Sequence, residues 1–199
     1  MISNICKIEK GTSDLSAILN ESKKVAVYNE LDEKQTLQLR LICEELDGML
    51  PNIIDEFSGE FWIEFTNGVC KVIASVCFEE FTAEKKKELV KLSTYKKNAC
   101  AVGLVGKIRS VIEDLVLDDE VSKKYDMAMM FNSAMEYSVG TDTTCCWSLN
   151  KYRNTESNQT TKDWDELEKS IVANLADDII VGVKGKQATI SVVKNFKRG

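Results

Sequence analysis

Hydrophobic side chains recur at two spacings along this chain, and together these predict a mixture of helices and strands. Apolar residues three and four positions apart predict helices over residues 13–29 and 33–50. Thr12 or Ser13 is the expected N-cap of the first helix and Asp32 that of the second, with Pro51 just past its end. The stripe expected to be buried on the second helix is Leu39, Ile42, Cys43, Leu46, Met49 and Leu50.

A β-hairpin is the clearest local prediction. Two strand-like runs, residues 61–66 and 69–77, flank Asn67-Gly68, the dipeptide favoured in two-residue type I′ turns. Such a turn sets the register, so Thr66 should face Val69, Phe65 should face Cys70 and Glu64 should face Lys71. The residues expected to share the buried face are Ile63, Phe65, Cys70, Val72, Ala74 and Val76.

The remaining elements are shorter or less regular. We expect a short edge strand near residues 2–9. In the middle of the chain we expect a basic helix at 82–94, a loop at 93–102 and a helix at 103–115. A polar loop at 153–162, a helix at 164–175 capped by Asp163, and strands at 179–184 and 187–193 that turn at Gly185 should follow. Residues 118–151 show no clean period. The pattern as a whole predicts an α/β sandwich, with helices over a mixed or antiparallel sheet.

Composition narrows the class of protein. The 199 residues are 44% hydrophobic and 29% charged, as in ordinary soluble domains. No apolar run approaches the roughly 20 residues that cross a bilayer, and the N-terminal residues lack the apolar core of a signal peptide. We therefore expect a cytoplasmic protein without a membrane partner.

The types of residue present exclude several chemistries. The chain has no histidine, which rules out Cys₂His₂ zinc sites and histidine-based triads. Its seven cysteines form no CxxC pair and mostly lie in apolar runs, as reduced structural thiols do. The adjacent Cys145-Cys146 leaves a redox element as an alternative, although the sequence offers no evident base to activate a thiol.

Charge is distributed unevenly. Residues 82–109 hold 8 basic and 2 acidic side chains, a net of +6, whereas the whole chain has a net charge of −6. A basic block within an acidic chain suits a small polyanion such as a nucleotide better than a nucleic-acid duplex. A solvated lysine face on one helix is the alternative interpretation.

Two glycines, Gly103 and Gly106, open the helix predicted beside this block. A glycine-spaced helix N-terminus can hold a phosphate, because its backbone N–H groups point outward and no side chain blocks approach. The segment is not a P-loop, since Ala101 stands where the first glycine belongs and Ile108 where the magnesium-binding hydroxyl belongs. It is not a Rossmann fingerprint either, because residue 101 is not a glycine and the preceding segment is not a convincing strand.

The order of these elements resembles the GHKL superfamily of ATP-binding domains, especially the anti-sigma-factor serine kinases. The segment 37–50, LQLRLICEELDGML, looks like the family's helix LRLxxEExxxN, and Gly103-Leu-Val-Gly106 is similar to its second glycine box. The resemblance covers roughly residues 1–115 and the final hairpin. It implies a single GHKL-like domain over residues 1–199, with an insertion at 116–162.

The resemblance also implies roles for individual residues. Glu45 matches the family's general base, whereas Met49 occupies the position of the asparagine that holds magnesium, and residues 76–81 lack the family's DxGxG adenine motif. Asp47 is the residue expected to point into the site in place of the missing ligand. The residues expected to hold the phosphates of ATP with Mg²⁺ are Gly103, Gly106 and Lys107, with Lys96 or Lys97 on a lid.

Two functions follow from the resemblance. The first is an ATP-binding bacterial regulatory protein, an anti-sigma-factor-type serine kinase whose Glu45 orients the attacking hydroxyl of a partner protein. The second is a catalytically dead module that keeps the fold and acts by binding a protein partner. The first function is the one we expect from the sequence, and the second is the alternative. The loss of the magnesium and adenine motifs is the feature that favours this alternative, and segment 116–162, rich in Met and aromatic residues, is its expected contact surface.

Overall fold

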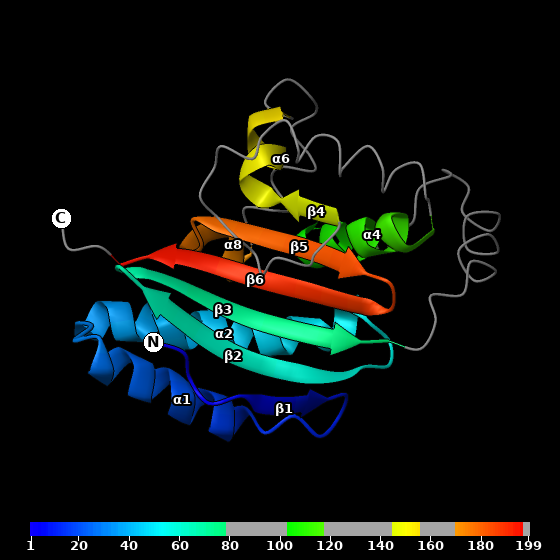
Figure 1. Ribbon diagram of the computed structural model, residues 1–199. Coiled ribbons are helices and arrows are strands. Elements are labelled where there is room, and N and C mark those ends of the chain that lie inside the picture. The colour runs from blue at the N-terminus through cyan, green and yellow to red at the C-terminus, as the bar shows by residue number, and fades with distance from the viewer. Residues whose placement is uncertain (79–102, 118–144, 156–169, 197–199) are drawn as a thin grey trace.

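The fold is a six-stranded antiparallel sheet with helices packed against it, seen in a computed structural model that describes residues 1–78, 103–117, 145–155 and 170–196 (Figure 1). The strand order is β1-β2-β3-β6-β5-β4, and every neighbouring pair is antiparallel. The strands are β1 (Cys6–Glu9), β2 (Ser58–Thr66), β3 (Val69–Cys77), β4 (Cys145–Ser148), β5 (Asp178–Lys184) and β6 (Gln187–Asn195). The helices are α1 (Leu15–Tyr28), α2 (Glu33–Ile53), α4 (Gly103–Leu117), α6 (Leu149–Thr155) and α8 (Ile171–Leu175). The predicted α/β class with an antiparallel sheet is therefore confirmed, while the helix and loop expected at 82–102 lie outside the described residues.

The ends of α1 and α2 differ in detail from the prediction. Asp14, not Thr12 or Ser13, caps α1, because its carboxylate accepts the backbone N–H groups of Ser16 and Ala17. Asp32 caps α2 as predicted and forms a capping box with Gln35. Pro51 lies within the last turn of α2 rather than beyond it, since the helix continues to Ile53, whose side chain is fully buried.

The turn between α1 and α2 is a Schellman motif built on an unusual residue. The Leu31 N–H donates to the Ala26 carbonyl (3.0 Å) and the Glu30 N–H to the Val27 carbonyl (3.2 Å). This pattern places Glu30 in the left-handed region, at φ 52°. Glycine normally occupies such a position, because a Cβ makes it unfavourable.

The hairpin forms in the predicted register. Thr66 pairs with Val69, Phe65 with Cys70 and Glu64 with Lys71. All six side chains predicted for its inner face are buried. Local alternation and a two-residue turn were therefore sufficient to position this half of the sheet.

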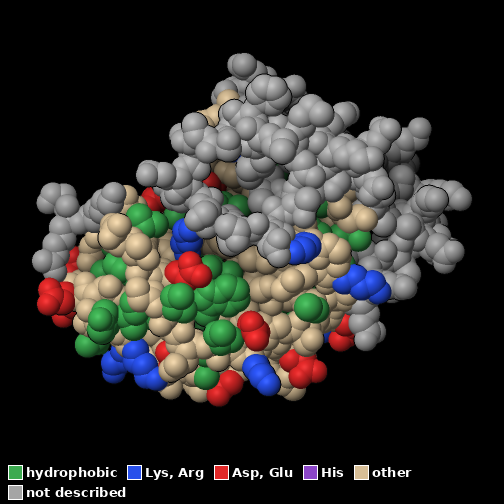
Figure 2. Space-filling view, viewed as in Figure 1, with side chains coloured by type: hydrophobic (Ala, Val, Ile, Leu, Met, Phe, Trp, Pro, Cys, Tyr) green, Lys and Arg blue, Asp and Glu red, His purple; other side chains and the backbone are tan. Residues whose placement is uncertain are grey.

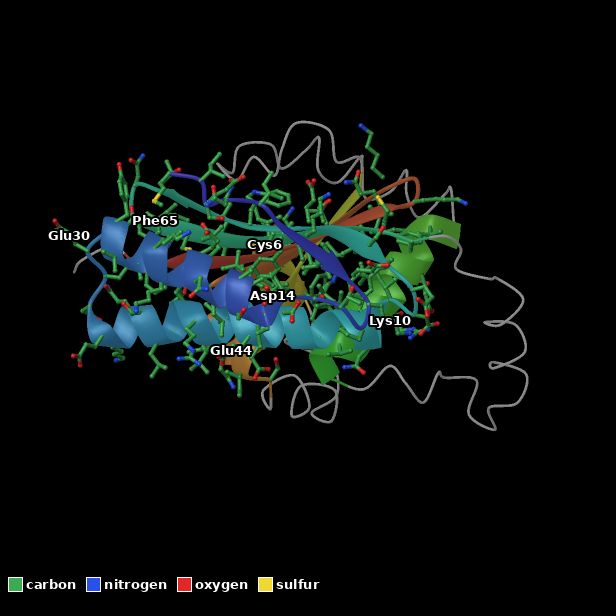
Figure 3. The ribbon with its side chains drawn as sticks, turned by 90° about the horizontal axis from the view of Figure 1, so that it is seen from below. Cys6, Lys10, Asp14, Glu30, Glu44 and Phe65 are labelled. Carbon is green, nitrogen blue, oxygen red and sulfur yellow. The ribbon has the colours of Figure 1, made fainter. Side chains whose placement is uncertain are left out.

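Helices cover one face of the sheet. α1 packs on β2, α2 packs on β3 and α4 packs on β5, while α2 also contacts α1, α4 and α8. Figure 3 shows α1 and α2 side by side on the same side of the strands. The core between the layers includes the stripe predicted for α2, and each of its six residues is at most 6% exposed. α2 is consequently the central helix of this layer.

The opposite face of the sheet carries a mixture of apolar and polar side chains. One row across the strands consists of Trp62, Ile73, Ser191 and Ile180. On the described part of the face viewed in Figure 2, hydrophobic side chains gather at the centre with charged side chains around them.

Two predictions in the second half of the chain were wrong in part. The strand β4 and the helix α6 were not foreseen, and α6 includes residues 153–155 of the expected polar loop. The helix expected at 164–175 does not include Ser170, whose backbone is extended and whose side chain caps α8 (Ile171–Leu175). Asp163, its expected cap, lies outside the described residues. Tertiary pairing explains β4, since its four residues align along β5.

We predict that Gly59→Ala destabilises the fold by more than about 2 kcal/mol. A Cβ at this position of β2 would collide with the Ser75 carbonyl oxygen and lie 2.8 Å from the Val76 Cα, and neither backbone atom can move without distorting β3. Gly48→Ala in α2 is the matched control, because nothing lies within 4 Å of its Cβ. The control should stabilise the protein by about 1 kcal/mol. Urea unfolding measures both, and equal effects would contradict the close approach of β2 and β3.

We also predict that Glu30→Gly stabilises the protein by about 0.5–1 kcal/mol, because relief of the left-handed strain exceeds the entropy lost by glycine. Asn29→Gly is the control. The φ of Asn29 is −96°, and its side-chain amide donates to the Val25 carbonyl at 2.8 Å, so this change should destabilise the protein. Destabilisation by Glu30→Gly would show that the Glu30 side chain holds the turn.

Candidate functional site

The two acidic residues singled out on α2 lie on opposite flanks of that helix. Successive residues of an α-helix are about 100° apart, so Glu45 and Asp47 diverge by about 200°. Both side chains are half-buried. The helix therefore does not bring these two carboxylates together.

Asp47 is in an unfavourable environment for a charge. Its Oδ1 atom is buried and has no hydrogen-bond partner. Burial raises the pKa of its carboxyl above the usual value.

Buried apolar side chains occupy the positions where the resembled family has its magnesium and adenine ligands. Met49 lies one turn beyond Glu45 on α2 and is 6% exposed, as part of the core. Phe78, which follows β3 where the resembled family has its adenine motif, is 5% exposed and belongs to the same core. A thioether does not replace the hard oxygen ligands of magnesium. These residues therefore do not fit a Mg²⁺–ATP complex.

The glycine-bearing helix α4 begins at Gly103, whose φ of 76° is in the left-handed region. Gly106 is buried, and the Lys107 ammonium lies 4.3 Å from the centre of the Tyr152 ring on α6. This cation–π contact directs Lys107 towards α6. Lys96 and Lys97, expected on a lid, lie outside the described residues.

Arg109, part of the basic block but not singled out as a site residue, anchors α4. Its guanidinium contacts both carboxylate oxygens of Asp55 at 3.2 Å and Glu113 at 3.1 Å. Asp55 lies in the connection between α2 and β2, so this fork joins the two segments. The arrangement gives one of the predicted basic residues a structural role.

Two open hollows lie elsewhere on the described surface. One of about 560 Å³ is lined by residues that include Lys7, Ser58, Glu60, Ser75, Cys77 and Gln187. The second, of about 470 Å³, lies where the α1–α2 turn meets the hairpin tip, and we call it the turn-end hollow. Its walls include Glu30, Leu31, Phe65, Gly68 and Phe196. Neither hollow is lined by Glu45, Asp47 or Gly103.

Sequence reasoning did not anticipate the turn-end hollow. Its residues come from three separate stretches of the chain, and the only local signal was the Asn67-Gly68 turn. The sequence also gives no sign that the backbone of Glu30 is left-handed, because glycine is the residue that usually indicates such a position.

Metal and thiol chemistry find little support in the described part of the chain. No group of three or more Cys, Asp or Glu side chains there is placed to hold a metal ion. Cys6, Cys43, Cys70 and Cys77 are free thiols, as predicted. Burial raises the pKa of Cys70 to about 12, so that thiol stays protonated and unreactive at neutral pH. The side chains of Cys145 and Cys146 lie outside the description.

We predict that Asp47→Asn stabilises the protein at pH 7. Because burial raises its pKa, the folded state binds this proton more tightly than the unfolded chain, and stability falls as pH rises through that raised pKa. The substitution should remove this part of the pH dependence and have little effect below the unfolded-state pKa. Glu45→Gln on the opposite flank, expected within about 0.5 kcal/mol of the parent, is the control. Urea unfolding between pH 3 and pH 8 provides the readout, and a destabilised Asp47→Asn at pH 7 would mean that the charge has a favourable partner.

Comparison with known proteins adds no identification: no family model, no curated protein and no solved structure matches the chain. None of the helices in the described residues combines the length and apolar character needed to cross a membrane. The functional interpretation therefore depends on the residues themselves.

Proposed function

We propose that this chain is a regulatory binding module that acts through a protein partner, and that it does not hold Mg²⁺–ATP at the place where the resembled GHKL domains do. The burial of Met49 carries this proposal. A core methionine, one turn beyond Glu45, occupies the position of the magnesium-binding asparagine. Phe78 supports it from the end of β3, where its side chain is also in the core.

The order of the elements supports the GHKL-like part of the proposal. A strand, two helices and a hairpin precede α4, and a second hairpin closes the sheet beside the first. The resemblance predicts this series, with residues 116–162 inserted before the final hairpin. A fold kept without its ligand positions is what a partner-binding module derived from an enzyme would show.

One observation favours the alternative of an ATP-binding, kinase-type regulator. Gly103 opens α4 in the left-handed conformation, and a helix N-terminus attracts anions. In that alternative Glu45 is the general base and Gly103, Gly106 and Lys107 hold the phosphates. The cation–π contact of Lys107 with Tyr152 would have to break first.

Thermal unfolding with and without Mg²⁺ and ATP, and with ADP for comparison, distinguishes the two. Ligand at a hundred times its Kd adds about 2.7 kcal/mol, which raises the midpoint of a protein of this size by roughly 5–10 °C. We expect no shift at millimolar nucleotide. A rise of that order, abolished in Lys107→Gln, would overturn the proposal and restore the kinase-type function.

A further inference from the structure

The turn-end hollow has an apolar floor. The rings of Phe65 and Phe196 stack there with centroids 6.4 Å apart and planes 4° from parallel. The Phe196 N–H donates to the Gly68 carbonyl at 2.7 Å, which joins the end of β6 to the hairpin tip. Figure 3 shows Glu30 and Phe65 at this end of the molecule, away from Lys10. The floor is therefore held by backbone bonds and does not depend on a ligand to form.

Exposed apolar side chains gather beside the hollow. Val27 is 72% exposed and Tyr28 73% exposed at the end of α1. Met1, 41% exposed, lies alongside, since its sulfur is 3.6 Å from the Asn29 amide nitrogen and its carbonyl accepts the Phe65 N–H. Val27, Tyr28 and Met1 are three of the eight large hydrophobic side chains exposed in the described residues. Scattered exposed hydrophobics are ordinary, but a gathered group marks an interaction surface.

The hollow also has an acidic side. Glu30 lines the hollow, and Asp32 and Glu33 follow it along the chain, so three exposed carboxylates lie within four positions before the cation Lys34. Glu30 is held there in a backbone conformation that glycine would adopt at lower cost. An apolar floor with an acidic rim complements a segment that carries both apolar and basic side chains.

We propose that the turn-end hollow is the docking site for a basic amphipathic segment of a protein partner. An apolar side chain of that segment enters against Phe65 and Phe196, and its Lys or Arg side chains pair with Glu30 and Glu33. The inference rests on the proposed function, because it names the surface with which a partner-binding module holds its partner.

The test uses a defined probe on the full chain. The probe is a labelled peptide of about four helical turns, with leucine on one face and lysine on the other, and its counterpart has glutamate in place of every lysine. Fluorescence anisotropy should show binding of the lysine peptide alone. Tyr28→Ser, and Glu30→Gln combined with Glu33→Gln, should each raise its Kd at least about tenfold.

Two control variants lie on the outer surface of α2, where Leu37 is 55% exposed and Glu44 is half-buried in an ion pair with Arg40. Leu37→Ser and Glu44→Gln should leave the Kd within about twofold of the parent. Equal weakening by the controls would overturn the proposal, because the peptide would then be attracted by net charge alone. Absence of binding would overturn it as well.

Light scattering tests a different occupant. If the chain dimerises with rising concentration and Tyr28→Ser abolishes the dimer, a second copy covers the hollow and the proposed occupant is wrong. A chain that stays monomeric while it binds the peptide supports the proposal. The proposed function can fail independently of this docking site. A thermal shift with Mg²⁺–ATP would contradict the proposed function, but it would not change the result of the peptide-binding measurement.

Discussion

The structure depends most on the packing of α2 against the sheet and the other helices. Seven of its side chains are at most 6% exposed: Leu39, Ile42, Cys43, Leu46, Met49, Leu50 and Ile53. Full burial of a leucine or isoleucine contributes about 1.5–3 kcal/mol, so this stripe is a large part of the hydrophobic driving force. Because α1, α4, α8 and β3 all contact α2, the orientation of this one helix decides which other side chains can reach solvent.

That orientation also determines the chemistry of the candidate site. With Met49 in the core, Glu45 lies at the edge of the buried stripe, and Asp47 is turned to the other flank. The resembled family needs a carboxylate and an asparagine one turn apart, both open to a nucleotide. Here the second position contributes to packing instead. Under the proposed function, Met49 thus adds volume to the core at the position where the resembled family has a ligand.

How much the sequence could predict follows from how local each interaction is. The register of β2 and β3 depends on Asn67-Gly68 and on alternation within 20 residues, and the α2 stripe depends on a helical period, so both were predicted. Asp14 caps α1 because its side chain reaches two backbone N–H groups. The sequence does not show this, since Thr12, Ser13 and Asp14 are adjacent and all three residue types are common N-caps. β4 exists because β5 offers an edge, and Ser170 breaks a helical pattern that the apolar spacing alone would continue. The turn-end hollow joins residues as distant as Glu30 and Phe196, so only the assembled fold could show it.

The measurement that tests the account most directly is the free energy of unfolding of Met49→Ala, compared with that of Leu37→Ala on the exposed side of the same helix. If Met49 is a core residue, its truncation leaves a cavity and costs about 2–5 kcal/mol, while the control stays within about 0.5 kcal/mol of the parent. A cost for Met49→Ala no greater than that of the control would contradict the account. It would mean that the side chain lines an open site, where a ligand could still be held.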